Sequence, residues 1–227
     1  MKKYYLKKLD QRGKVAVWQV DGSIIRDKID IEFTNFGHHY RYSYIPKYEF
    51  WLDREADANE EEFYITHLLT DWELMKKGYN HWNAGAIAEK KEAAERKKAK
   101  DFSLALNKNG QPVVEKIHLR LLQKTATGLS VWVVRGKLVR NVLNIDFTEG
   151  GHDLVYDFVP KNEVWIDNDI YSEERLPIIL HEIYERSLMA DGLGYLAAHR
   201  RASRLEHEAR NNKKILKSNL TLLGWKY

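Results

Sequence analysis

Short apolar runs, separated by polar residues, follow one another in the C-terminal half of the chain. The stretches at 116–123, 130–136, 137–147, 154–160 and 163–167 are rich in β-branched and aromatic residues, and Gly, Asn, Asp or Pro divides them. Short runs with this composition and these boundaries are typical of β-strands. The pattern therefore predicts a sheet built from these five segments.

Turns and helices are expected around these strands. Gly in the segments 134–137 and 20–23 predicts tight hairpin turns. Farther along, the apolar spacing changes to a helical period and predicts helices over 173–190 and 195–210. Ser172 is the expected N-cap of the first helix, because acidic residues follow it and favour the positive end of a helix.

The chain contains an internal duplication. Residues 17–96 and 131–210 align without a gap at a constant offset of 114, with 26 identities over 80 positions. Two copies are too few for a solenoid, which needs at least about three units. We therefore expect an α+β tandem duplication, in which each copy is a small, mainly antiparallel sheet followed by two helices and the copies form a pseudo-twofold pair. The expected domains are 1–104 and 115–227, with Asn-Gly and Pro in the connector.

The amino-acid composition limits which side chains could bind a metal or act as a nucleophile. The 227 residues are 44% hydrophobic and include no cysteine, which excludes disulfides, a thiol nucleophile and cysteine-containing zinc sites. Any metal must therefore be bound by His, Asp or Glu. The basic N-terminal segment lacks the apolar core of a signal peptide, and no run of 18 apolar residues occurs. The expected location is cytoplasmic, without a membrane span.

Basic residues gather in three places, near 90–100, 200–204 and 213–217, and the formal net charge is +4. Such clusters fit a polyanion partner, with nucleic acid bound through the basic helices, or an unidentified protein partner. Solvated faces of ordinary helices are the commoner explanation for such clusters, since no nucleic-acid-binding motif accompanies them. The C-terminal tail, 211–227, carries apolar residues that could dock on the body of the protein or on a partner.

The predicted helices carry polar groups at inward positions. The helix at 173–190 is apolar on two sides, so His181 and Glu185, one turn apart, are expected in a covered site. On the next helix, His199 and Glu206 interrupt an apolar stripe. Buried polar groups cost free energy unless they are paired or bind a metal. We therefore expect these four side chains to meet.

The segment His181-Glu182-Ile183-Tyr184-Glu185 resembles the HExxH helix of zincin metallopeptidases. The strand at 163–167 before it and the helix after it also resemble the small zincin core. The resemblance implies a divalent metal such as zinc, with His181 as the first ligand and Glu182 as the general base. Glu185 stands where the family has its second histidine, and the third ligand is His199 or Glu206.

The first copy retains part of this set. His181, Glu185 and Glu206 correspond to His67, Asp71 and Glu92, whereas Glu182 becomes a leucine and His199 a glycine. One interpretation is an active second copy beside an inactive first copy. The other is a polar clamp that fixes the packing of two helices in both copies.

Two further histidines, His38 and His152, are shared and follow Gly just before an expected strand. Each could face a ligand, although a turn histidine bonded to the backbone is the commoner case. Phosphate-binding loops and a serine-hydrolase elbow are absent from the sequence. Because the HExxH motif is altered, the sequence favours a non-enzymatic, two-lobed interaction or scaffold protein with a buried His/Glu cluster. The alternative is a metal-dependent, zincin-like hydrolase whose second repeat is active.

Overall fold

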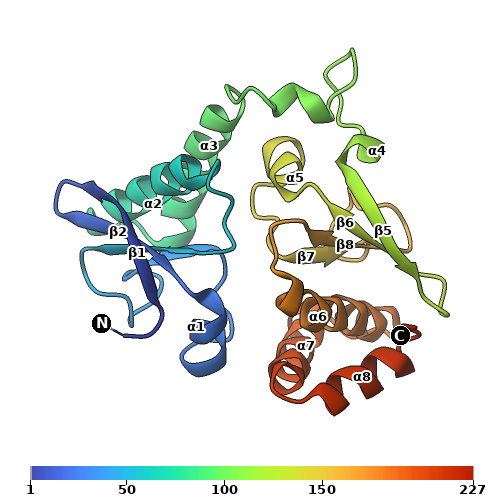
Figure 1. Cartoon of the computed structure of the whole chain (residues 1–227). Coiled ribbons are helices and arrows are strands. Elements are labelled where there is room, and N and C mark those ends of the chain that lie inside the picture. Colours follow the sequence, from blue (N-terminus) through green and yellow to red (C-terminus); the bar gives the residue numbers. More distant parts are fainter. Residues whose placement is uncertain (1, 227) are drawn as a thin grey trace. The chain divides into compact units, whose positions relative to one another are not determined.

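A computed structural model describes residues 2–226 of the chain. It divides into two compact units, Met1–Ser103 and Leu104–Tyr227. The division lies at the start of the connector expected near 104–115. Both units are α+β, and each consists of a four-stranded sheet followed by helices (Figure 1). The predicted fold class, with two similar halves, is confirmed.

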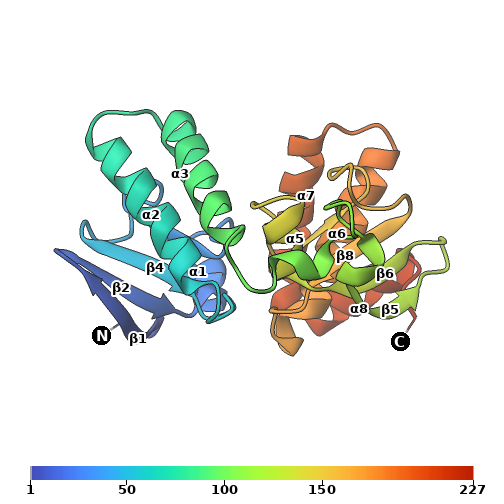
Figure 2. The same cartoon turned by 90° about the horizontal axis from the view of Figure 1, so that it is seen from above.

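The first unit begins with a strand pair and ends with a helical pair. Its elements are β1 (Tyr5–Arg12), β2 (Val15–Val20), α1 (Gly22–Lys28), β3 (Phe36–His38), β4 (Glu49–Asp53), α2 (Glu61–Lys76) and α3 (His81–Arg96). A 3-10 turn, Phe102–Ala105, follows at the unit boundary. Figure 2 shows α2 and α3 side by side above the sheet.

The second unit repeats this order and adds a helix at its end. Its elements are α4 (Val114–Ile117), β5 (His118–Lys124), β6 (Ser130–Val134), α5 (Gly136–Val142), β7 (Gly150–His152), β8 (Glu163–Asp167), α6 (Ser172–Ala190), α7 (Tyr195–Arg210) and α8 (Lys213–Leu222). The helix expected over 195–210 has the predicted bounds, and the one expected over 173–190 begins one residue earlier.

The two sheets share one topology. Their strand orders are β1-β2-β4-β3 and β5-β6-β8-β7. The two central strands of each sheet run parallel and the outer pairings are antiparallel. Equivalent tryptophans are in register, with Trp18 opposite Trp51 and Trp132 opposite Trp165. The sheet is therefore mainly antiparallel, as predicted, but a crossover joins its central strands.

Three expectations for local structure are wrong. The segment 137–147 contains the helix α5 instead of a strand, and 154–160 forms turns. The expected hairpin turns at 134–137 and 20–23 instead lead from a strand into a helix. Parallel neighbours cannot be joined by a hairpin, and a short apolar run is compatible with either period. The helix also brings Arg140 to the buried carboxylate of Asp167 and to the partly buried carboxylate of Asp169.

The N-terminus of α6 also differs from the expectation. Tyr171 occupies the N-cap position and no side chain caps the helix. Ser172 is instead the first helical residue, and its hydroxyl donates to Glu173. The acidic residues Glu173 and Glu174 lie in the first turn, where the helix dipole favours them.

Each sheet is covered on both faces. In the second unit, Val164 and Ile166 pack against the buried side of α6, while Trp165 between them belongs to a separate cluster with Val139 of α5. Successive side chains of a strand point to opposite faces, so α5 and α6 lie on different sides of the sheet. This arrangement fixes α6 against β7 and β8, where the polar cluster lies.

The C-terminal tail docks on the body of its own unit. Residues 213–222 form α8, whose Leu220 is fully buried in the core, and Leu216, Leu223 and Trp225 pack around it. Of the two roles expected for this tail, the structure shows the intramolecular one. Lys213, Lys214 and Lys217 remain on its exposed side. Among the described residues, no helix is long and apolar enough to cross a bilayer.

Candidate metal centre

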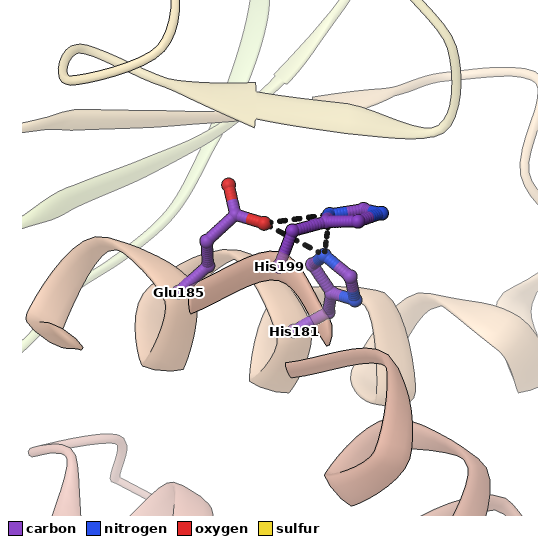
Figure 3. A group of neighbouring side chains, drawn as sticks. All are labelled: His181, Glu185 and His199. Atoms are coloured by element: carbon purple, nitrogen blue, oxygen red, sulfur yellow. Dashed lines mark hydrogen bonds and ion pairs between the residues drawn. The ribbon is translucent and has the colours of Figure 1, made fainter. Parts of the chain in front are cut away.

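Three ligand-type side chains converge between α6 and α7. His181 and Glu185 lie one turn apart on α6, and His199 reaches them from α7 (Figure 3). Oε2 of Glu185 lies 2.7 Å from Nδ1 of His199 and 3.3 Å from Nε2 of His181, and the two histidine nitrogens are 3.2 Å apart. Thus one nitrogen or oxygen from each side chain faces the same point.

The spacing of these atoms fits a small cation. Nitrogen and oxygen ligands bind zinc at about 2.0–2.1 Å, so two ligand atoms of a tetrahedral site lie about 3.3 Å apart. Two of the three separations match this value, and the shortest is a hydrogen-bond distance. Two imidazoles and one carboxylate are also a ligand set used by catalytic zinc sites, which keep a fourth position open.

Glu206 orients His181 from the opposite side of its ring. Its Oε2 lies 2.7 Å from Nδ1 of His181, and its other oxygen pairs with Arg210, which also pairs with Glu174. A carboxylate at Nδ1 fixes the tautomer that leaves Nε2 free for a metal. Of the two candidates for a third ligand, His199 faces the cluster and Glu206 does not.

His152 on β7 contacts Glu185 but is held as a hydrogen-bond donor. The backbone N–H of Leu154 donates to Nδ1 of His152 over 3.2 Å, so Nδ1 is unprotonated. Nε2 then carries the proton and donates to Oε1 of Glu185 over 3.1 Å. His152 therefore positions the carboxylate and is not suited to bind a metal itself. It combines the two roles considered from the sequence, because it bonds to the backbone and also faces the site.

Glu182 lies beside the three converging residues. One of its carboxylate oxygens is within 4.8 Å of ligand atoms of His152 and Glu185. Burial raises the pKa of Glu182 to about 7, against the opposing effects of His181 and His152. Gly150 on β7 makes room for it, since a Cβ there would lie 3.0 Å from Cγ of Glu182. A carboxyl group with this pKa can exchange a proton near neutral pH.

The charges of the other two α6 residues are set by their contacts. Burial opposes the charged form of His181, but hydrogen bonds to Glu185 and Glu206 outweigh it and hold its pKa well above the usual value. Burial likewise disfavours ionised Glu185, and hydrogen bonds from His152, His181 and His199 overcome this effect and lower its pKa. In this structure the cluster thus pairs the ionised carboxylate of Glu185 with the imidazolium form of His181.

The structure brings together all five site residues proposed from the sequence, four of them within one hydrogen-bonded group and Glu182 beside it. Sequence reasoning missed the bond from His152 to Glu185 and the pairing of Arg210 with Glu174. The shared Gly-His of the two copies was the signal for the first, and the shared arginine at 96 and 210 was the signal for the second.

No family model, curated protein or solved structure matches the chain.

Proposed function

We propose that the second unit is a metal-dependent hydrolase centre that binds one divalent cation, such as zinc, through His181, Glu185 and His199. The observation that carries this proposal is the convergence of one ligand atom from each residue, at separations of 2.7–3.3 Å. Support comes from Glu206, which leaves Nε2 of His181 free. A cation bound there would supply a Lewis acid that makes water acidic enough to lose a proton near neutral pH.

Glu182 is the residue suited to accept that proton. Its carboxylate lies beside the ligand set, and burial holds its pKa at about 7. A group with a pKa near the working pH accepts a proton in one step and returns it in the next. His152 holds Glu185 in place through Nε2, so the carboxylate keeps Oε2 toward the two histidines.

Binding and catalysis can be tested separately. Glu182→Gln should retain zinc, because Glu182 is not one of the three ligands, and should lose hydrolysis of a mixed panel of casein, p-nitrophenyl acetate and bis-p-nitrophenyl phosphate. Loss of a general base lowers rates about 10²–10⁴-fold. The exposed Glu208→Gln on α7 is the matched control. No hydrolysis by zinc-loaded wild type, or full hydrolysis by Glu182→Gln, would contradict the catalytic part.

The non-enzymatic interaction protein is the competing proposal. The first unit favours it, because His67 and Glu92 form the same buried clamp there, and Gly85 stands where the second unit has His199. The exposed cations on α7 and α8 would then contact an acidic protein or a nucleic acid. A wild-type protein that binds no metal, but binds DNA or RNA with a steep salt dependence, would support this alternative.

A further inference from the structure

The two units differ around one shared carboxylate. Asp71 on α2 is the counterpart of Glu185, and both accept a hydrogen bond from Nε2 of an equivalent histidine, His38 at 3.0 Å and His152 at 3.1 Å. The backbone fixes the tautomer of His38 in the same way, through the N–H of Tyr40. The histidine contact is therefore common to both units. In the second unit His152 and the two ligand histidines contact different oxygens of Glu185, whereas in the first unit His38 shares Oδ2 of Asp71 with Arg41.

Arg41 is the second donor to Asp71 in the first unit. Its Nε donates to Oδ2 of Asp71 over 2.7 Å. Its Nη2 lies 2.9 Å from the place where a Cβ on Gly85 would be, and Gly85 is the counterpart of His199. In the second unit the counterpart of Arg41 is the uncharged Val155. The guanidinium thus fills the space into which a histidine on α3 would extend.

The first unit still has two of the three ligand atoms. Nδ1 of His67 lies 2.9 Å from Oε2 of Glu92, which leaves Nε2 as a bare acceptor. Nε2 of His67 and Oδ1 of Asp71 are both buried and have no hydrogen-bond partner among residues 2–226. Phe36 covers His67 at a ring distance of 5.1 Å, where the second unit has Gly150.

We infer that the Arg41 guanidinium is a built-in cation, which takes in the first unit the place that a divalent metal takes in the second. The inference rests on the proposed function for its metal and adds that the first unit is a metal-independent copy. The chain then binds one metal ion and not two. Arg41 excludes the second ion both by its charge on Asp71 and by its position beside Gly85.

The test rebuilds the third ligand in the first unit. All variants carry His199→Ala, so that the second unit lacks one ligand and does not bind zinc. Zinc per chain is measured by equilibrium dialysis against zinc chloride. We expect Gly85→His alone to bind no zinc and Arg41→Val with Gly85→His to bind one equivalent. Arg41→Lys with Gly85→His keeps the charge and should bind at least tenfold more weakly. Zinc binding by Gly85→His alone, or equal binding by the Val and Lys variants, would overturn the inference, as would no binding by a folded Val variant.

If Arg41→Val with Gly85→His does not fold, a double-mutant cycle between Arg41 and Asp71 tests the inference instead. Arg41→Val, Asp71→Asn and the double variant are compared with wild type by the melting temperature of the first unit. Asp71→Asn should lower it less in the Arg41→Val background than in wild type, because the buried charge is then already unpaired. Additive shifts would contradict the role of Arg41. Wild-type protein that binds no zinc would contradict the proposed function, whereas the mutant cycle tests only the pairing of Arg41 with Asp71.

Discussion

Nδ1 of His181 and Oε2 of Glu206 lie 2.7 Å apart across the contact between α6 and α7, and His67 and Glu92 form the same bond in the first unit at 2.9 Å. In both units an arginine one turn farther along the helix holds the glutamate. The bond therefore belongs to the duplicated scaffold. In the second unit alone, it presents the opposite nitrogen of the imidazole to a histidine and a carboxylate.

Glu206→Gln should weaken metal binding without removing a ligand. The amide keeps the shape of the side chain but loses the charge that raises the basicity of His181, and such changes beside a ligand cost about 10–100-fold in metal affinity. Competition with a chelator measures the zinc affinity. Glu208→Gln, an exposed change on the same helix, is the control. Equal affinities for Glu206→Gln and wild type would show that Glu206 does not act through His181.

His152→Ala should lower both the free energy of unfolding and the zinc affinity. It removes the donor to Oε1 of Glu185, and an unsatisfied buried acceptor costs about 1–3 kcal/mol. Urea unfolding of the zinc-free protein measures the first effect and zinc titration the second. His207→Ala on α7 serves for comparison. A variant as stable as wild type, with unchanged zinc affinity, would mean that the bond does not position Glu185.

The pair of Asp71 and Arg41 should give the first unit a stability that is lost in acid. Burial disfavours ionised Asp71, but hydrogen bonds from His38 and Arg41 outweigh burial and lower its pKa. Because the folded pKa lies below the unfolded value, about 3.9, the contribution is complete above that pH and declines as the pH falls toward the folded pKa.

Asp71→Asn isolates this contribution. At pH 7 it should cost about 1.5–3 kcal/mol, the range for a hydrogen bond to a charged group. The difference in unfolding free energy between wild type and Asp71→Asn should shrink as the pH is lowered below about 4. Urea unfolding at a series of pH values measures it. A difference that stays constant down to pH 2 would argue against an ionised Asp71 in this pair.

Gly136→Ala should destabilise the second unit although alanine is the better helix former. A Cβ at this position would overlap the carboxylate of Asp167, which pairs with the buried Arg140. Overpacking of this kind costs about 1–3 kcal/mol. Gly194→Ala has nothing within 4 Å of the new Cβ and should cost less than about 1 kcal/mol, as the loss of a helix N-cap. Thermal unfolding that ranks the two variants in the opposite order would contradict this packing.

The overall organisation could be predicted from the sequence because its signals are repeated or long. The gap-free repeat identified two units, and the helical periods of α6 and α7 gave bounds within one residue of the structure. The segment 137–147 could not be assigned in this way, because its apolar residues fit either period. Its helix is favoured by long-range contacts of Arg140 with Asp167 and Asp169, which no local pattern encodes.

The candidate site was predictable where its residues share one helix. His181 and Glu185 are four residues apart, and the stripe on α7 pointed to His199 and Glu206. The contact of His152 with Glu185 spans 33 residues and arises from the pairing of β7 with β8 above α6. The role of Arg41 depends on the absence of a side chain at Gly85, which becomes meaningful only when both units are compared in space.

The zinc content of the folded protein shows whether His181, Glu185 and His199 form a metal centre. Purified wild type is incubated with zinc chloride, dialysed against metal-free buffer and analysed for zinc per chain, alongside His181→Ala, His199→Ala and the control His207→Ala. We expect one equivalent in wild type and in His207→Ala, and none in the other two variants. Folded wild type without zinc, or zinc retained in full by both His181→Ala and His199→Ala, would contradict a metal centre at these residues.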